Sequence, residues 1–251
     1  VKSIHATHKY SSNLRPSSIP ETNQHKVLQN TRKKMKLAWS AERASKAYIH
    51  TVQSCQNFHE SGVAEMISAM ASGWNAKLIA ETWSQGGVIS TSMGLSIAKN
   101  YTGGRHVCIV PDERSRSEYS SRMIETGMSP EIMVGEADEV MNDLVGIDFL
   151  VVDSRRKDYH RVLRLAKLST KGAVLVCKNV CSKPDSSSSF MWRSVLGQGS
   201  SHKLVRSVFL PVGKGVEMAH VSATGVNNLV KGKRWVRHVD QRSGDVHFIR
   251  T

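Results

Sequence analysis

The chain has 251 residues and carries a formal net charge of +14, with 39% hydrophobic residues. This length suits one α/β domain with terminal extensions and is too small for two full domains. No apolar stretch approaches the about 18 residues that span a bilayer, so we expect no membrane association and a cytoplasmic protein, with the nucleus as the alternative. The positive charge predicts attraction to anionic molecules and excludes no fold.

Residues 1–34 are rich in Ser, Asn, His and Lys and show no helical or strand periodicity. They hold seven Lys or Arg residues against one acid, Glu21. Segments with this composition bury too little apolar surface to fold, so we predict a disordered basic extension. The predicted domain covers residues 35–230, and residues 231–251 are predicted as a basic C-terminal tail that forms a short hairpin from the runs at 235–240 and 246–250.

Strand and helix patterns alternate across the predicted domain. Apolar periodicity predicts two helices, at residues 40–57 and 62–70, and then strands at residues 77–81, 106–111, 131–134, 149–153 and 173–177. Helices are predicted between these strands, at residues 87–99, 114–126, 138–144 and 156–168. Such alternation is typical of βαβ units with parallel strands. Two further runs, at 203–212 and 216–223, predict an antiparallel hairpin at the sheet edge.

Polar clusters follow three of the predicted strands. Glu81 ends the first strand, Asp153 ends the fourth, and Lys178 with Asn179 follows the fifth. The carboxyl ends of parallel strands face the ligand crevice of an α/β protein, so these clusters mark the predicted site. A glycine pair after Glu81 leads into a helix, whose free N–H groups can meet an anionic ligand. A tight strand-to-helix turn is the alternative explanation of that pair.

These motifs resemble those of class I S-adenosylmethionine-dependent methyltransferases of the catechol and caffeoyl-coenzyme A O-methyltransferase type. The similar residues are Glu81 with Gly87 six positions on, Gly135-Glu136-Ala137, Asp153, and Lys178-Asn179. The span from residue 35 onward is also similar to a plant family of unknown function, number fourteen-forty-two, in phrases such as Arg105-His-Val-Cys-Ile-Val-Pro and Val208-Phe-Leu-Pro-Val-Gly-Lys-Gly. The resemblance implies a Rossmann-like methyltransferase fold: a mostly parallel twisted sheet, an antiparallel C-terminal hairpin and helices on both faces.

The resemblance also implies that S-adenosylmethionine is the cofactor. It assigns cofactor contacts to residues after the first three strands, namely Glu81, Trp83, Gly86, Gly87, Asp112, Glu113, Gly135, Glu136 and Ala137. Trp83 stands where that family has a glycine, and we expect its side chain to crowd the methionine end of the cofactor. The second strand ends in Val110 and Pro111 rather than in an acid, so Asp112 or Glu113 follows one or two residues late.

The metal site of the resembling enzymes is changed. They supply two aspartates and an asparagine to a divalent cation, whereas this chain has Asp153, Lys178 and Asn179. Two unit charges about 4 Å apart interact by roughly 4 kcal/mol at an effective dielectric constant of about 20, so an ammonium in place of a carboxylate reverses a large attraction. We therefore expect no metal and assign these three residues as catalytic residues facing the acceptor.

The corresponding hypothesis is that Lys178 pairs with Asp153 and offers a fixed positive charge to an oxygen or an acidic group of the substrate. A purely structural ion pair is the alternative. A basic stripe of Lys157, Arg161 and Arg164 on a predicted helix has the spacing of a solvated helix face.

Three functions follow from these observations. The first is a metal-independent methyltransferase acting on a small molecule. The second is a non-catalytic protein of the same fold that binds or scaffolds an anionic ligand or partner. The third and weakest is a nucleic-acid-binding module driven by the +14 charge, whose affinity would fall steeply with salt. Neither the acceptor nor the oligomeric state follows from the sequence.

Overall fold

The computed structural model describes residues 39–58, 62–180, 192–196, 202–222, 235–239 and 246–250. The predicted basic extension over residues 1–34 lies outside these ranges, and so does the turn of the predicted C-terminal hairpin at 241–245. None of the described helices has both the length and the apolar character that crossing a bilayer requires.

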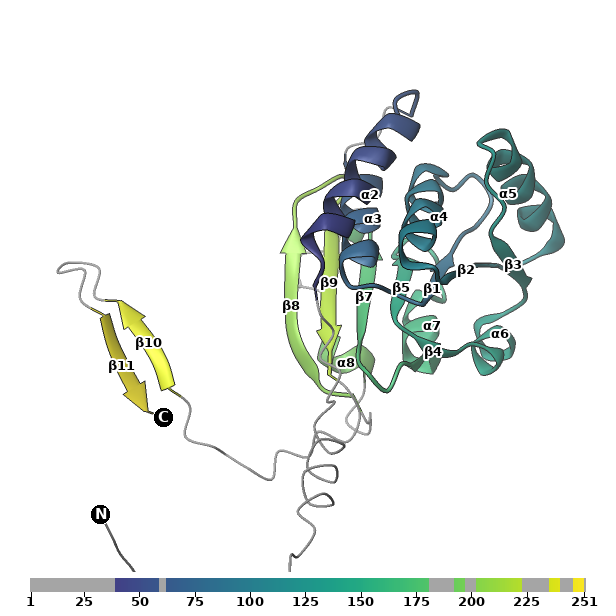
Figure 1. The fold of residues 1–251 in the computed structure, drawn as a ribbon. Coiled ribbons are helices and arrows are strands. Elements are labelled where there is room, and N and C mark those ends of the chain that lie inside the picture. The colour runs from purple at the N-terminus through teal and green to yellow at the C-terminus, as the bar shows by residue number, and fades with distance from the viewer. Residues whose placement is uncertain are drawn as a thin grey trace, which may run out of the picture. The chain divides into compact units, whose positions relative to one another are not determined.

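The core of the protein is a seven-stranded sheet with the strand order β3-β2-β1-β5-β7-β9-β8 (Figure 1). Its parallel strands are β1 (Leu78–Thr82), β2 (Arg105–Val110), β3 (Glu131–Val134), β5 (Phe149–Asp153) and β7 (Ala173–Lys178). The antiparallel strands at one edge are β8 (Leu204–Leu210) and β9 (Val216–Val221). The predicted fold class is therefore confirmed.

Helices cover both faces of this sheet (Figure 1). One face carries α2 (Ala41–Ser54), α3 (Val63–Gly73), α4 (Ser90–Thr102) and α5 (Glu113–Glu125). The other carries α6 (Ala137–Asp143), α7 (Tyr159–Leu165) and α8 (Trp192–Leu196). Because side chains alternate along a strand, Ile79 and Val151 pack with α3 and α4 while Ala80 and Val152 pack with α6, α7 and α8. Burial on both faces explains why these strands are continuous apolar runs in the sequence.

The structure adds two short strands that the sequence pattern does not predict. They are β4 (Val145–Ile147) and β6 (Lys167–Leu168), which pair in parallel as a separate two-stranded sheet. The predicted helix over residues 156–168 was too long at both ends. It begins at Tyr159 and ends at Leu165, because residues 167–168 pair with β4 instead of continuing the helix. Runs of two or three residues are too short to show a strand period.

The C-terminal tail contains the two strands predicted there. β10 (Trp235–Val239) and β11 (Val246–Arg250) pair in antiparallel register, with Trp235 opposite Arg250. They form a two-stranded sheet of their own.

Candidate functional site

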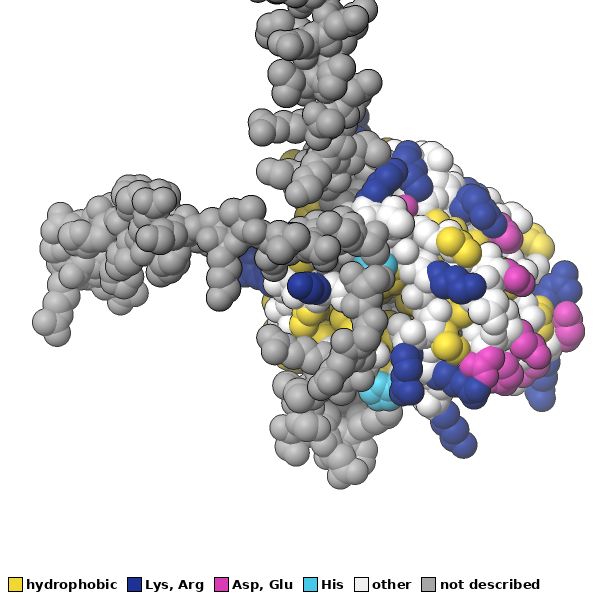
Figure 2. Space-filling view, turned by 90° about the horizontal axis from the view of Figure 1, so that it is seen from below, with side chains coloured by type: hydrophobic (Ala, Val, Ile, Leu, Met, Phe, Trp, Pro, Cys, Tyr) yellow, Lys and Arg dark blue, Asp and Glu magenta, His cyan; other side chains and the backbone are white. Residues whose placement is uncertain are grey.

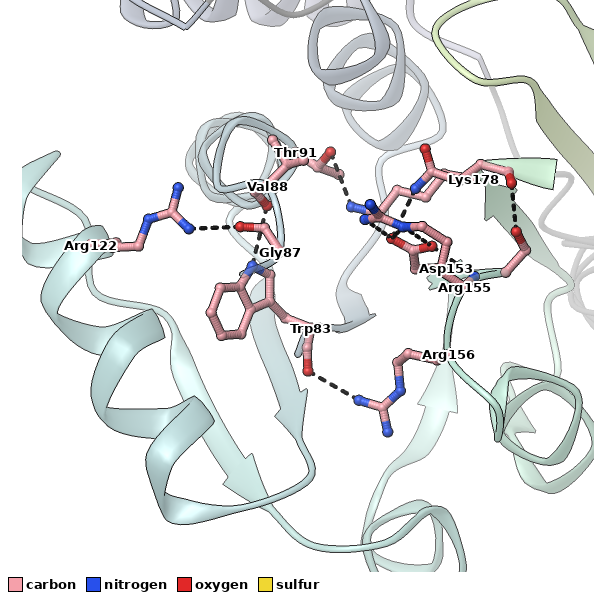
Figure 3. A network of polar contacts seen from close by, with 11 residues as sticks. Trp83, Gly87, Val88, Thr91, Arg122, Asp153, Arg155, Arg156 and Lys178 are labelled. Atoms are coloured by element: carbon pink, nitrogen blue, oxygen red, sulfur yellow. Dashed lines mark hydrogen bonds and ion pairs between the residues drawn. The ribbon is translucent and has the colours of Figure 1, made fainter. Parts of the chain in front are cut away.

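Three of the predicted site residues, Glu81, Asp153 and Lys178, lie at the ends of β1, β5 and β7. Figure 3 shows Asp153 and Lys178 side by side there. The chain builds the sheet outward from β1 through β2 to β3, and then crosses to β5 and β7 on the other side of β1. Such a reversal of strand order is the position at which open α/β sheets bind ligands. β1 pairs with β5, and β5 pairs with β7 so that Asp153 lies opposite Lys178.

Glu81, at the end of β1, is buried with 1% of its surface exposed. Its Oε1 atom accepts a hydrogen bond from the Tyr119 hydroxyl at 2.9 Å and lies 3.0 Å from His106 Nε2. His106 Nδ1 in turn lies 2.9 Å from the Ser96 hydroxyl. Burial raises the pKa of Glu81, but the hydrogen bond and charge of His106 and the charge of Lys178 hold that pKa below its ordinary value of 4.5. Glu81 is therefore a carboxylate fixed by the neighbouring strand and helix.

Three buried polar atoms near the start of α4 make no hydrogen bond of normal length and angle in the described part of the chain, although the Ser92 side chain is close enough to Glu81 to lower the pKa of that carboxyl group. They are Glu81 Oε2, Thr82 Oγ1 and Ser92 Oγ. Burying such an atom without a partner costs about 1–3 kcal/mol. The junction of β1 with α4 therefore has unsatisfied capacity for hydrogen bonds with a polar ligand.

Trp83 lies beneath the glycine loop that follows β1. Its indole is buried, with 3% exposed, and its ring centre is 5.2 Å from that of Tyr119. The Trp83 Nε1–H group donates to the Val88 carbonyl at 3.2 Å (Figure 3). A Cβ atom added at Gly87 would lie only 2.7 Å from Trp83 Nε1 and from the Ser84 carbonyl oxygen. Glycine is thus required at this position because the indole supports the loop from below.

Helix α5 holds the same loop from the side. The Gly86 N–H donates to Glu118 Oε1 at 3.1 Å, and Arg122 donates to the Gly87 carbonyl at 2.7 Å. Gly86 has a left-handed backbone with φ of 72°. The backbone N–H of Gly86, a residue assigned to the cofactor, therefore donates to the protein's own glutamate.

The acids after β2 also serve the helix that follows. Asp112 Oδ1 accepts the Ser115 N–H at 2.7 Å as the N-cap of α5. This hydrogen bond with the Ser115 backbone lowers the pKa of Asp112. Glu113, one residue on, pairs with Arg116 at 3.1 Å on the surface. Both acids lie at the carboxyl end of β2, as predicted.

The Gly135-Glu136-Ala137 motif connects β3 to α6. The Gly135 N–H donates to the Val110 carbonyl at 3.0 Å, which joins the ends of β2 and β3. Gly135 has φ of 148°, and a Cβ atom there would lie 3.0 Å from Glu139 Oε2. Glu136 is exposed whereas Ala137 is buried. The assigned cofactor residues thus occupy the ends of three adjacent strands.

Asp153, at the end of β5, is surrounded by donors. Arg155 NH2 lies 2.6 Å from its Oδ2 atom, and the Asn179 side chain donates to the same oxygen at 2.9 Å. Burial raises the pKa of Asp153, but the hydrogen bond from Arg155 and the charge of Lys178 hold that pKa below its ordinary value. Asn179 has a left-handed backbone, with φ of 64°, which is strained for a residue other than glycine.

Lys178 is buried beside this pair, with 5% of its surface exposed. Its Nζ atom donates to Thr91 Oγ1, in the first turn of α4, at 3.4 Å (Figure 3). The predicted Lys178–Asp153 ion pair is not formed among these described residues. Asp153 pairs with Arg155 instead, because the chain turns back after β5 and also brings the Arg155 N–H within 3.0 Å of Asp153 Oδ1. Lys178 acts on Asp153 through its charge at longer range.

A divalent cation does not suit this set of side chains. The ammonium of Lys178 and the guanidinium of Arg155 already surround Asp153 with positive charge. Within the described ranges, no group of three His, Cys, Asp or Glu side chains is placed to hold a metal ion. The donor set argues for a cation supplied by the protein.

Arg156 connects the two halves of the site. It donates to the Trp83 carbonyl at 3.0 Å and pairs with Asp158 at 2.6 Å (Figure 3). The contacts of Arg156, Thr91, His106 and Tyr119 were missed by sequence reasoning. They involve residues far apart in the chain, such as Lys178 and Thr91 at 87 positions, and no local pattern reports such distances.

A separate hollow of about 460 Å³ lies beside the start of α4. Ile89, Met93 and Arg122 contribute to its lining. Helical residues advance by about 100° each, so Thr91 points away from the side that carries Ile89 and Met93. This hollow is therefore on the opposite side of α4 from Lys178.

Charged side chains on the face seen from below do not merge into one basic surface (Figure 2). The visible Lys and Arg side chains are spread over that face, and acidic side chains gather toward one side of it. Arg161, from the predicted basic stripe, forms an ion pair with Asp138. The described part of this face is thus mixed in charge.

Comparisons with known proteins place the chain among methyltransferase folds. The sequence model of the family described as Protein of unknown function (DUF1442) matches residues 35–251. The comparison with curated proteins found no match.

Solved structures extend this comparison. An O-methyltransferase from Bacillus cereus in complex with SAH is 16% identical, with a TM-score of 0.52, over 78% of this chain and 96% of that one. A methyltransferase from Geobacter sulfurreducens is 17% identical, with a TM-score of 0.50, over 78% and 94%. A Staphylococcus aureus protein proposed to be a caffeoyl-CoA O-methyltransferase is 12% identical, with a TM-score of 0.50, over 69% and 91%. These similarities establish the fold.

Proposed function

Since the chain belongs to the DUF1442 family and has the methyltransferase fold, we propose that it binds S-adenosylmethionine and is a methyltransferase that needs no metal. One observation carries this proposal. Within the described chain, Glu81 Oε2, Thr82 Oγ1 and Ser92 Oγ are buried without a hydrogen bond of normal length and angle at the junction of β1 and α4. A ligand with an amino group and hydroxyl groups would satisfy them, and S-adenosylmethionine has both.

The chain's own residues fit this ligand at three strand ends. Glu81 would face the amino group, Asp112 or Glu113 the ribose, and the segment 135–137 the adenine. When bound, the cofactor supplies an electrophilic methyl group. The protein supplies orientation: Arg156 ties the loop after β1 to the loop after β5, so that both sides of the site keep a fixed spacing.

Asp153, Lys178 and Asn179 are assigned to the acceptor. Arg155 and Asn179 hold Asp153 in one orientation, and Lys178 contributes a positive charge where the resembling enzymes have a metal. A charge fixed in a buried site stabilises an acceptor oxyanion more strongly than the same charge in water. Lys178 therefore takes over the electrostatic part of the metal's role.

A second candidate is the non-catalytic protein that binds an anionic ligand. It is favoured by the hydrogen bonds within the glycine loop, because Glu118 engages the Gly86 N–H and Arg156 engages the Trp83 carbonyl. Loop groups that are already paired are less available to a cofactor. In this case Lys178 would bind an anion without methyl transfer.

Isothermal titration of S-adenosylmethionine and S-adenosylhomocysteine into the full chain tests the proposal. We expect saturable binding that is the same with Mg²⁺ and with a chelator. Glu81→Gln should weaken binding by about tenfold, the effect of one charged hydrogen bond. The matched control is Glu131→Gln, which removes an exposed carboxylate paired with Arg105 at the start of β3. No binding at millimolar ligand would reject the proposal in favour of the second candidate.

A further inference from the structure

We propose that the ligand recognised beside Lys178 is a carboxylate with a single negative charge, held by the Lys178 ammonium, the Thr91 hydroxyl and the first turn of α4. The inference rests on the proposed function for its identification of this ligand as the acceptor. The binding site itself rests on the contacts of Lys178 and can be tested without any methyl transfer.

Among the described residues, no carboxylate forms a direct ion pair with the Lys178 ammonium. It is 5% exposed, and its one hydrogen bond among the described residues is the 3.4 Å contact with Thr91 Oγ1. An ammonium group has three donors, so a single long bond to a neutral oxygen leaves most of its capacity unused. Burying a charge is costly unless an anion and hydrogen bonds compensate it. An anionic ligand group would supply both.

The start of α4 strengthens the preference for an anion. Helix α4 has 13 residues, and its N-cap, Ile89, makes no side-chain cap hydrogen bond. Its first turn carries no acidic residue. Ser92 is fully buried there, and its hydroxyl makes no hydrogen bond of normal length and angle in the described chain. The N–H groups and the dipole of a helix start favour negative charge.

The surrounding charges limit the ligand to one negative charge. The charge of Lys178 lowers the pKa of two nearby acids, Glu81 and Asp153. His106 is already paired with Glu81. Arg155 is already paired with Asp153. A dianion such as a phosphate would therefore meet two nearby carboxylates with only one uncommitted cation. A monoanion matches the ammonium.

A neutral hydroxyl group fits this site less well. It would leave the ammonium without a counterion and would have to lose a proton before it could accept a methyl group. Asp153, opposite Lys178 on the neighbouring strand, is a candidate base, but Arg155 holds its pKa below the ordinary value, which makes it a weak base. A carboxylic acid is already ionised at neutral pH and needs no base. The site therefore favours an acceptor that arrives as an anion.

Three probes with one shared ring separate these possibilities: benzoate, phenyl phosphate and benzyl alcohol. Saturation-transfer NMR and calorimetry on the full chain would measure their affinities, with and without saturating S-adenosylhomocysteine. We expect benzoate to bind at least tenfold more tightly than either other probe. Lys178→Met should weaken the binding of benzoate by at least tenfold. Lys171→Met, which removes an exposed lysine ahead of β7, should leave benzoate binding unchanged.

A second variant keeps the test decisive if Lys178→Met fails to fold. Thr91→Val keeps the size and removes the hydroxyl, and we expect a loss of benzoate affinity of about threefold or more. Equal binding to wild type and to both variants would overturn the inference. Loss of benzoate binding in Arg122→Gln alone would also overturn it, because the probe would then occupy the hollow on the other side of α4.

The two proposals fail in different ways. Benzoate binding that depends on Lys178 without any binding of S-adenosylhomocysteine would reject the methyltransferase and keep the carboxylate site. Binding of S-adenosylhomocysteine with a preference for phenyl phosphate or benzyl alcohol would reject the carboxylate site and keep the methyltransferase.

Discussion

The end of β1 and the ends of β5 and β7 both hold a buried acid in place, but they do so through different kinds of contact. Each holds a buried acid whose pKa is lowered, and Lys178 acts on both acids through its charge. Glu81 is fixed by His106 and Tyr119, which come from another strand and another helix. Asp153 is fixed by Arg155, which follows it two residues later. The first region depends on tertiary packing, whereas the second is mostly a local turn.

This difference predicts unequal effects of mutation. Removing a partner of Glu81 leaves a carboxylate sealed from water, while removing a partner of Asp153 leaves one that water can approach. The β1 end should therefore be the stability-critical half, and the β5–β7 end should tolerate changes and carry the ligand preference.

The largest effect is expected for His106→Leu. The substitution removes one of the two partners of Glu81 Oε1 in a fully buried position and leaves only the Tyr119 hydroxyl, so the free energy of unfolding should fall by about 3 kcal/mol. Urea unfolding measures this loss. The matched control is the neighbouring Arg105→Leu, which breaks an exposed pair with Glu131 and should cost less than about 1 kcal/mol. Equal losses in the two variants would show that the buried His106–Glu81 pair contributes no more to stability than the exposed Arg105–Glu131 pair.

A smaller loss is expected for Gly87→Ala. The new methyl group would approach the Ser84 carbonyl and the Trp83 indole to 2.7 Å, and the loop must shift at a cost of about 2 kcal/mol. Gly86→Ala is the control, because it meets open space and only suffers its φ of 72°. Gly86→Ala should lower the free energy of unfolding by about 1 kcal/mol. Thermal unfolding would compare the two, and a greater loss in Gly86→Ala would contradict the packing of Trp83 under the loop.

At the other end of the site, Arg155→Gln should raise the pKa of Asp153. The native pKa lies below the ordinary value of 3.8, so the ionised carboxylate stabilises the fold above that pH and loses this effect as the pH falls through the native pKa. The variant should therefore be less stable by about 1 kcal/mol at neutral pH and equal to wild type in strong acid. Unfolding at several pH values tests this, together with a carboxyl NMR titration of Asp153. A constant difference at all pH values would assign the effect to packing.

The smallest effect concerns a third acid, Glu217 on β9, which forms no ion pair with the described residues. Burial raises its pKa, and only the Trp192 indole, at 3.4 Å, opposes this. A raised native pKa means that stability is present below the ordinary value of 4.5 and lost as the pH rises through the native pKa. Glu217→Gln should thus stabilise the protein by about 0.5 kcal/mol at neutral pH and by nothing in acid. Destabilisation at neutral pH would mean that the carboxylate has an ionic partner.

Much of the fold was predictable because its signals are local. Apolar runs such as Phe149–Val152 are buried on both faces and read as strands, and helix starts such as Asp112 carry their own cap. The short strands β4 and β6 were not predictable, since their residues pair only because the sheet brings them together. The positions of Glu81, Asp153 and Lys178 at strand ends followed from the same alternation.

The sequence by itself determined the parallel α/β arrangement and the strand-end positions of Glu81, Asp153 and Lys178. Each depends on neighbours within a few residues. Only the tertiary structure decided that His106 and Tyr119 hold Glu81. It also decided that Lys178 donates to Thr91. Those contacts depend on how the strands and helices pack, because more than one side chain of the sequence could have paired with the same charged group. Packing geometry, which no local pattern encodes, selects among them.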